Sequence, residues 1–324
     1  MSESVPEVMQ AVVSADLAGA RLDQAAAELF PDFSRARLQQ WIKQGALLVD
    51  GCPAKARDKV SGGEQLQLEA QFEPQGEWQP QDLPLNVVFE DEQLLVIDKP
   101  AGLVVHPAAG NADGTLLNAL LHYLPNQALL PRGGIVHRLD KDTTGLLVVA
   151  KTPKSHQSLI DQLQARTVGR EYTALVQGEL IAGGEINTPI GRHPKNRKKM
   201  AVVRHGGKEA LTRYWVTEKF PVYSLLRVKL ETGRTHQIRV HMAHRGYPLV
   251  GDTTYGARLK VPKAAPAELL DMLRGFGRQA LHASRLQLLH PASGEQLRWE
   301  SPLPEDFASL LDALREFAAQ REGD

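Results

Sequence analysis

Short runs of apolar and β-branched residues, rather than long amphipathic helices, dominate the chain from residue 94 onward. The clearest of these runs, each as long as an ordinary strand, are residues 94–97, 146–150, 172–176, 211–216 and 225–230. Helical periodicity is found at fewer places, at residues 116–124, 155–166 and 304–320. The pattern predicts an α+β domain with a large, mainly antiparallel mixed sheet.

The first part of the chain has a different order of elements. A helical pattern covers residues 22–30 and breaks at Pro31, and Ser34 is the expected N-cap of a second helix that runs to Lys43. Gly45 is expected to end that helix. Two further runs, residues 47–49 and 64–68, have the alternation of strands. We therefore predict a small α/β domain at residues 18–75.

An acidic segment separates the two patterns. Residues 70–95 contain six Asp or Glu and no Lys or Arg, together with several Gln and Pro. This composition is typical of a linker. The predicted organisation is a first domain at residues 18–75, a linker at 76–87 and a larger second domain at 88–324.

Composition limits the class of protein. The formal net charge is zero, but residues 192–213 contain eight Lys or Arg against one Glu, a local charge that suits phosphates. The single cysteine, Cys52, excludes a disulfide framework and agrees with a reducing compartment. Neither a leader segment nor a membrane-spanning run is expected. These features predict a soluble cytoplasmic protein, and a monomer is expected.

Polar side chains are concentrated in residues 133–144, directly before the apolar strand at residues 146–150. Loops held by a rigid strand are common positions for catalytic groups. An isolated aspartate there, such as Asp140, is more often a turn former or a cap. Asp140 is not isolated, because it belongs to the string HRLDKDTTGLLVVAK at residues 137–151.

That string closely resembles the signature of the RluA-type pseudouridine synthases. The resemblance implies that Asp140 is the catalytic carboxylate and that Arg138 enters the RNA helix where the target uridine has been turned out. It also implies an RNA contact at His137 and a supporting role for Thr144.

A second segment, residues 230–241 (LETGRTHQIRVH), resembles the GRTHQIR motif of the same family. The resemblance implies that Arg234 pairs with the catalytic aspartate and that Gln237 and Arg239 support the site. Taken alone, Arg234 would be a surface arginine after a glycine turn.

A third segment, residues 170–178 (REYTALVQG), resembles the family's K-x-Y-x-A-x-V-x-G strand, with Arg170 in place of the usual Lys. The resemblance implies that Tyr172 lies against the flipped uracil and takes part in removing the C5 proton. Residues 97–107 (IDKPAGLVVHP) resemble the family's opening segment and are expected to form a wall of the site.

Two basic regions are expected to bind RNA. Residues 191–203 and 206–214 look like the family's RNA-clamping hairpin and following strand, and the expected contacts are Arg192, Lys195, Arg197, Lys198 and Lys199. Residues 20–51 resemble the S4 RNA-binding domain, in which paired helices present basic residues; the expected contacts there are Arg35, Arg37 and Lys43.

Pseudouridine formation breaks the N1–C1′ bond of uridine, turns the uracil, joins C5 to C1′ and removes the C5 proton. A carboxylate can attack the sugar, stabilise an oxocarbenium-like centre or remove a sugar proton, and the sequence leaves these routes open. No metal and no organic cofactor are expected. The S4-like domain with these motifs implies a 23S ribosomal RNA stem-loop such as helix 69, in the large (50S) ribosomal subunit or its assembly precursor. Transfer RNA or another ribosomal site is the alternative.

Four other classes of protein were compared with this interpretation. The histidine-rich stretch at residues 236–244 with Asp252 matches no zinc signature, which disfavours a metal hydrolase. Asp140 and Asp142 stand too close together for an RNA glycosidase. No glycine-rich loop follows an early strand, as an RNA methyltransferase would need. A non-catalytic ribosome assembly factor would tolerate Asp140→Asn.

Overall fold

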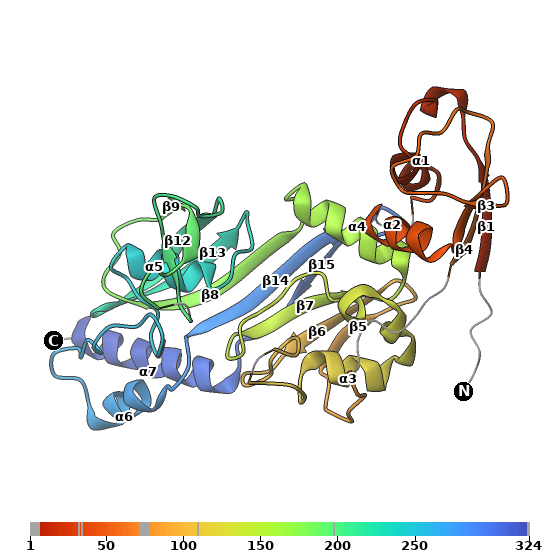
Figure 1. The fold of residues 1–324 in the computed structure, drawn as a ribbon. Helices are drawn as coiled ribbons and strands as arrows, with labels where there is room; N and C mark the ends of the chain where they lie inside the picture. The colour runs from red at the N-terminus through yellow and green to blue at the C-terminus, as the bar shows by residue number, and fades with distance from the viewer. Residues whose placement is uncertain are drawn as a thin grey trace.

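The computed structural model describes residues 7–31, 33, 35–70, 78–108, 110–196 and 198–322. Within these residues the strands form a four-stranded sheet near the N-terminus, a nine-stranded sheet and a two-stranded hairpin (Figure 1). The expected N-cap Ser34 and the expected RNA contact Arg197 lie outside the described residues.

The N-terminal unit consists of two helices packed on an antiparallel sheet with strand order β1-β4-β2-β3. Its elements are β1 (Glu7–Val12), η1 (Ala15–Leu17), α1 (Leu22–Leu29), α2 (Arg35–Gln44), β2 (Leu47–Val49), β3 (Cys52–Pro53) and β4 (Gln65–Ala70). The unit has its own core, in which Leu22 of α1, Leu38 and Trp41 of α2, and Leu66 of β4 are buried. Gly45 follows α2 with a φ of 78°, a conformation that suits glycine at a helix end.

The end of the acidic segment lies against the second domain. Residues 78–86 form no helix or strand. The amide of Gln81 donates to the carbonyl of Asn118 (3.0 Å), and the Gln81 side chain accepts from the amide of Gly114 (2.7 Å). The rings of Trp78 and His106 make a T-shaped contact, with centroids 4.8 Å apart. These residues are therefore anchored beside α3 (Leu116–Tyr123).

The nine-stranded sheet has the order β5-β6-β7-β14-β8-β13-β12-β9, with β15 paired to β14. Its strands are β5 (Val87–Glu90), β6 (Leu94–Lys99), β7 (Thr144–Ala150), β8 (Gly169–Gln177), β9 (Gly184–Asn187), β12 (Leu211–Phe220), β13 (Tyr223–Leu230), β14 (Leu281–Leu289) and β15 (Gln296–Glu300). All pairs are antiparallel except β7 with β14. The prediction of a large, mainly antiparallel mixed sheet is confirmed.

The helices of this domain agree with the sequence in part. The three predicted helices are present as α3, α4 (Pro153–Gln164) and α7 (Glu305–Glu322). Two more, α5 (Gln237–His244) and α6 (Ala267–Gly275), were not predicted. In α5 even the polar side chains Gln237, Arg239 and His241 are buried, so the helix has no amphipathic stripe to detect. Two 3-10 turns, η2 (Pro125–Leu129) and η3 (Pro131–Gly134), lead toward β7.

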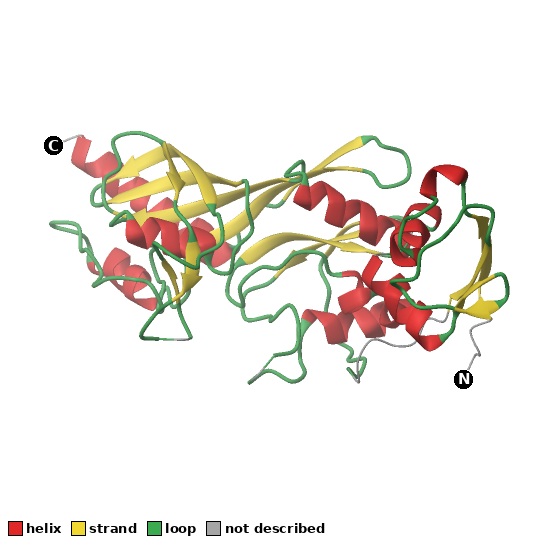
Figure 2. Cartoon of the chain, turned by 45° about the horizontal axis from the view of Figure 1, so that its top comes forward, coloured by secondary structure: helices red, strands yellow, loops and turns green. Residues whose placement is uncertain are grey.

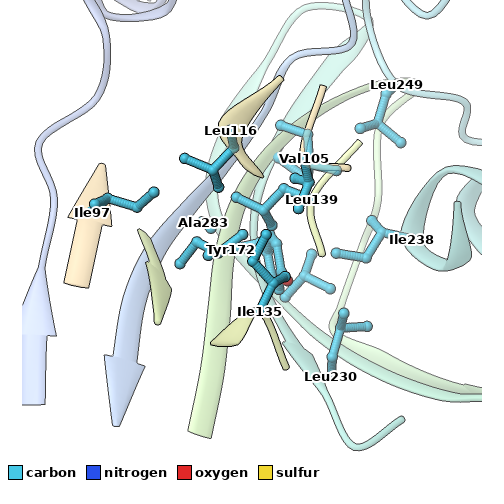
Figure 3. Close-up of a cluster of buried hydrophobic side chains, with 14 of the residues drawn as sticks. Ile97, Val105, Leu116, Ile135, Leu139, Tyr172, Leu230, Ile238, Leu249 and Ala283 are labelled. Carbon is cyan, nitrogen blue, oxygen red and sulfur yellow. The ribbon is translucent and has the colours of Figure 1, made fainter. Parts of the chain in front are cut away.

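Successive side chains along each strand point to opposite faces of the sheet, so they enter different hydrophobic cores. On one face Leu147 of β7 and Tyr172 of β8 join the core beneath α3 and α5, which Figure 3 shows around Tyr172. On the other face Leu146 of β7 packs near Leu159 of α4, and Leu175 of β8 packs with α6 and α7. Figure 2 shows these helices lying against the long strands. The central strands are thus buried on both faces.

The start of β7 lies very close to β14. Gly145 has a φ of 109°, and a Cβ at this position would lie 2.3 Å from the carbonyl oxygen of Ala283. Only glycine satisfies both conditions. The contact holds the loop that precedes β7 at a defined place on the sheet.

Candidate active site

The loop between η3 and β7 carries Asp140 and is tied to the end of β6 by a buried lysine. Lys99 is 1% exposed, and its Nζ donates to the carbonyls of Pro100 (2.8 Å), Leu103 (2.9 Å) and Lys141 (2.8 Å). Burial lowers the pKa of Lys99 to about 7, against the opposing charges of Asp142 and Asp140. The DKPAG turn is therefore connected directly to the residue that follows Asp140.

Asp140 is held by an arginine shared with a second carboxylate. Arg239 of α5 donates from Nη1 to Oδ2 of Asp140 (3.0 Å), and from Nε and Nη2 to the two oxygens of Asp252 (2.7 and 2.9 Å). Asp252 has a fully buried side chain and also accepts from the amides of Thr254 and Tyr255 (both 2.9 Å). The Asp252 loop thus orients the guanidinium that orients Asp140.

Arg239 and Asp252 keep each other ionised despite their burial. Burial alone would raise the pKa of Asp252, but the hydrogen bonds and charge of Arg239 outweigh it and lower that pKa. Burial would lower the pKa of Arg239, and the two carboxylates outweigh it and raise that pKa. Arg239 therefore stays a cation while it contacts both carboxylates.

The prediction that Arg234 pairs with Asp140 is wrong. Arg234 instead donates from Nε to the carbonyl of Glu209 (2.9 Å), although it lines the cavity that Asp140 faces. The reason is geometric. The turn before α5 ends at His236, and α5 then directs the side chain of Arg239, rather than that of Arg234, at the carboxylate.

His236 approaches Asp140 from the start of α5. Its backbone is left-handed, with a φ of 57°, which is a strained conformation for a residue with a side chain. Its Nε2 lies 3.7 Å from Oδ1 of Asp140, and its Nδ1 lies 2.7 Å from the hydroxyl of Tyr255. Burial lowers the pKa of His236, against the opposing charge of Asp140. This left-handed backbone places the imidazole of His236 beside Oδ1 of Asp140. Because its pKa is lowered, the imidazole is neutral at neutral pH.

Tyr172 of β8 lies with Asp140 along a small cavity of about 50 Å³. The tyrosine is 5% exposed, and burial is the main cause that raises the pKa of its hydroxyl. The hydroxyl therefore stays protonated at neutral pH. Asp140 and Tyr172 line this cavity together with His236 and the predicted supporting residue Arg239, and the catalytic roles of Asp140 and Tyr172 stay predictions.

A much larger cavity, of about 800 Å³, continues from the small one. The two cavities share five lining residues: Arg138, Asp140, Tyr172, Leu230 and Arg234. Arg138 is exposed, and its contact with RNA stays a prediction. Asp140 thus lies where a narrow end meets a wide, open space.

The side chain of His137 is turned into the protein. Its Nε2 accepts from the amide of Val148 (3.1 Å), and burial lowers the pKa of the ring to about 3. Its Nδ1 is buried without a hydrogen-bond partner among the described residues. Leaving such a group unpaired costs about 1–3 kcal/mol. The RNA contact at His137 stays a prediction.

The supporting residues Thr144 and Gln237 make buried hydrogen bonds. Thr144 Oγ1 lies 2.9 Å from His282 Nδ1. Gln237 accepts from the Thr232 hydroxyl (2.8 Å) and from the Arg234 amide (3.0 Å), and it donates to Thr212 (2.9 Å). Gln237 therefore fixes the turn that precedes α5.

The predicted basic hairpin is formed by β10 (Ile190–Arg192) and β11 (Met200–Val202). Arg192, Lys195 and Lys198 are exposed on it. Lys199 is different, because its amine donates to the carbonyl of Thr254 and lies 6.0 Å from the ring centre of Tyr255. Lys199 therefore joins the hairpin to the loop that holds Asp252, and RNA contacts of the hairpin stay predictions.

The expected RNA contacts of the N-terminal unit differ in their surroundings. Arg35 donates to the fully buried carboxylate of Asp23 (2.8 and 3.0 Å) while part of its side chain stays exposed. Arg37 stacks over Trp41 (5.0 Å), and Lys43 is exposed. Their binding to RNA is not tested by these contacts.

Sequence reasoning missed four residues of the site: Lys99, His236, Tyr255 and Asp252. Lys99 and His236 belong to motifs that the sequence analysis recognised, but no role in the site was predicted for either residue. Asp252 follows an apolar run and precedes Thr-Thr, a pattern that predicts only a turn. Its contact with Arg239 depends on how two loops pack.

In the described part of the chain, no helix is long and apolar enough to cross a membrane. The same residues contain no group of three or more His, Cys, Asp or Glu arranged to hold a metal ion.

The site combines an aspartate held by a buried arginine, a buried tyrosine beside it and exposed basic side chains around it, an arrangement that suits an enzyme acting on RNA. Residues 93–244 match the RNA pseudouridylate synthase family, and residues 20–66 match the S4 domain. The chain belongs to the RNA pseudouridine synthase family and carries an N-terminal S4 domain. The predicted family and enzyme class are confirmed.

Similar proteins extend this assignment over nearly the full chain. One is "Ribosomal large subunit pseudouridine synthase D" of Pseudomonas aeruginosa, 60% identical over 306 residues, which are 94% of this chain and 95% of that protein. The protein of that name from Escherichia coli K12 is 52% identical over 309 residues, 95% of this chain and 94% of the relative. Among solved structures, human RNA pseudouridylate synthase domain containing 4 is similar with a TM-score of 0.55 and 26% identity, over 71% of this chain and 93% of that one.

Proposed function

We propose that this enzyme converts uridines to pseudouridine in large-subunit (23S) ribosomal RNA, at a stem-loop such as helix 69, with Asp140 as the catalytic carboxylate. The ribosomal substrate is supported by the relatives, which are named for the ribosomal large subunit, and by the S4 domain. The substrate is then the 50S subunit or its assembly precursor.

The single observation that carries the chemical proposal is the contact of Asp140 with Arg239. It occupies Oδ2 of the carboxylate, and Oδ1 lies 3.7 Å from Nε2 of His236. A carboxylate oriented in this way can attack C1′ of a flipped uridine as a nucleophile, stabilise an oxocarbenium-like centre there, or remove a sugar proton as a base. The N1–C1′ bond breaks, the uracil turns, and C5 joins C1′.

Tyr172 is the residue proposed to meet the uracil. Its flat ring forms part of the cavity lined by Asp140, and its protonated hydroxyl can hydrogen-bond the base. The proton lost from C5 is balanced by the proton gained at N1, so the product is an isomer of the substrate. No atom is added and no electron is transferred, which is why the reaction needs no cofactor.

The test is pseudouridine mapping on large-subunit RNA incubated with the wild type or with Asp140→Asn, without added metal or cofactor. We expect conversion of defined uridines by the wild type and none by the variant, which retains an oxygen for Arg239. Equal conversion by both would remove Asp140 from the mechanism. Conversion of transfer RNA alone would overturn the ribosomal target but not the chemistry.

A further inference from the structure

Tyr255 lies between the basic hairpin and the start of α5, and the proposed reaction assigns it no role. It packs against a small hydrophobic cluster that includes Ile190 of β10 and Val240 of α5. Its ring makes a T-shaped contact with the imidazole of His236, with centroids 5.5 Å apart. The position of the tyrosine is therefore fixed by both the hairpin and the segment that leads into α5.

The hydroxyl of Tyr255 has two hydrogen-bond neighbours in the part of the chain that the structure describes. It accepts from the amide of Met200 in β11 (2.8 Å), and it lies 2.7 Å from Nδ1 of His236. Burial is the largest cause that raises the pKa of Tyr255, so the hydroxyl keeps its proton at neutral pH. Because an amide N–H can only donate, the hydrogen of the hydroxyl is left for Nδ1.

The direction of these hydrogen bonds determines the tautomer of His236. Nδ1 accepts from Tyr255 and therefore carries no hydrogen of its own. Burial lowers the pKa of the imidazole, so the ring is neutral at neutral pH. A neutral imidazole has a single N–H hydrogen, and in His236 this hydrogen is then on Nε2.

Nε2 of His236 is the ring atom that faces Asp140. It lies 3.7 Å from Oδ1, while Arg239 donates to Oδ2 (3.0 Å). This distance is about half an ångström longer than an N–H···O hydrogen bond. Hydrogen bonds of catalytic groups are often long before the substrate binds and shorten in the complex. A hydrogen on Nε2 attracts the carboxylate, whereas the lone pair of the other tautomer would repel it.

We propose that Tyr255 is a positioning residue for Asp140 and acts through His236. By donating to Nδ1, it directs the hydrogen of Nε2 at Oδ1, so that His236 and Arg239 hold the two oxygens of the carboxylate. Each carboxylate oxygen has a second lone pair, which stays available for the sugar. The inference rests on the proposed role of Asp140 and adds a residue that sets its geometry.

The first measurement is the nitrogen NMR spectrum of the histidine rings in the full-length wild type, which distinguishes ring nitrogens with and without a hydrogen. The signals of His236 are identified by their loss in His236→Asn, since asparagine tolerates a left-handed backbone. We expect Nδ1 without a hydrogen and Nε2 with one. A hydrogen on Nδ1 in the wild type would overturn the proposal, whatever the variants do.

The second measurement compares two variants that each lose one hydroxyl. Tyr255→Phe keeps the ring, and with it the contact with His236 and the stacking of Arg239 over the ring (5.1 Å). Tyr223→Phe is the matched control, because Tyr223 is a buried tyrosine of β13 whose hydroxyl donates to the carbonyl of Lys260, outside the site. Thermal melting checks that both variants fold. Single-turnover rates at saturating RNA and the Kd for the same RNA are then measured.

We expect Tyr255→Phe to lower the single-turnover rate about tenfold, less than the roughly 10²-fold that a misplacement of about 1 Å can cause. Its Kd should stay close to that of the wild type, and His236 should lose its single tautomer. Tyr223→Phe should keep the wild-type rate and tautomer. Equal rates for the two variants would overturn the proposal. A defect of Tyr255→Phe confined to the Kd would also overturn it, because the tyrosine would then serve RNA binding by the hairpin.

Asp140→Asn separates this inference from the proposed function. If that variant converts uridines as well as the wild type does, the catalytic role of Asp140 fails and the inference fails with it. If Asp140→Asn converts none while Tyr255→Phe keeps the wild-type rate, only the role of Tyr255 fails.

Discussion

Arg239 joins Asp140 to Asp252, donating one hydrogen bond to the first carboxylate and two to the second. The bidentate contact with Asp252 fixes the plane of the guanidinium, and the remaining nitrogen then fixes Asp140. The position of the Asp140 carboxylate, the proposed catalytic group, is thus set by a residue on a distant loop.

Asp252→Asn should lower kcat because the guanidinium loses the charge that orients it. A misplacement of about 1 Å can cost about 10²-fold in rate, and we expect a loss of about that size. Removing one partner of a buried pair should also destabilise the fold by about 3–5 kcal/mol. Single-turnover kinetics and urea unfolding measure the two effects. An unchanged rate would show that Arg239 is positioned without Asp252.

Arg239→Lys and Arg234→Lys form a matched comparison. A lysine at 239 cannot contact both carboxylates in the same geometry, so kcat should fall by about tenfold or more. A lysine at 234 can still reach a carbonyl and keeps the cavity positive, so its effect on kcat should be smaller. Single-turnover rates on one RNA decide the order. The reverse order would restore Arg234 as the arginine that acts on Asp140.

Lys99→Met should change how stability depends on pH. The pKa of Lys99 is about 7 in the folded protein, because of burial, and about 10.4 in an unfolded chain. Between these values the unfolded state binds more protons, so the free energy of unfolding rises with pH, by up to about 1.4 kcal/mol per unit. The variant should lack this rise. Urea unfolding from pH 7 to 10 tests it, and parallel curves would contradict it.

His137→Gln should reduce sensitivity to acid. Burial lowers the pKa of His137 to about 3, against about 6.5 when unfolded. Stability from this group is complete above pH 6.5 and is lost as the pH falls toward 3, because the unfolded chain takes up the proton first. Glutamine can still accept from the amide of Val148. Equal loss of stability in both proteins between pH 6.5 and 4 would refute the assignment.

Gly145→Ala should destabilise the protein by about 2–4 kcal/mol, because a Cβ there would lie 2.3 Å from the carbonyl oxygen of Ala283 at a φ of 109°. Gly277→Ala is the control, since its Cβ would meet only the Gly275 carbonyl oxygen, at 3.8 Å. Thermal unfolding compares the two. Equal melting temperatures would mean that β7 and β14 can separate without cost.

Much of the fold was predictable because its determinants are local. The apolar and β-branched residues of 172–176 and the apolar run at 146–150 predict strands, and the periodicity of residues 304–320 predicts α7. The helix α5 was not predictable in this way, because its buried polar residues Gln237 and Arg239 have partners far along the chain. Periodicity detects apolar faces and cannot detect polar groups that tertiary contacts satisfy.

The same distinction between local and tertiary determinants holds for the site. The sequence by itself determined the family, the S4 domain, and the residues Asp140 and Tyr172 as candidates, because these depend on motifs contained in single segments. Which arginine holds Asp140 was decided by the tertiary structure. The left-handed turn at His236 and the packing of the Asp252 loop against α5 direct Arg239, and not Arg234, to the carboxylate. The direction of a side chain and its distance from a group on another segment are fixed only when the segments pack together.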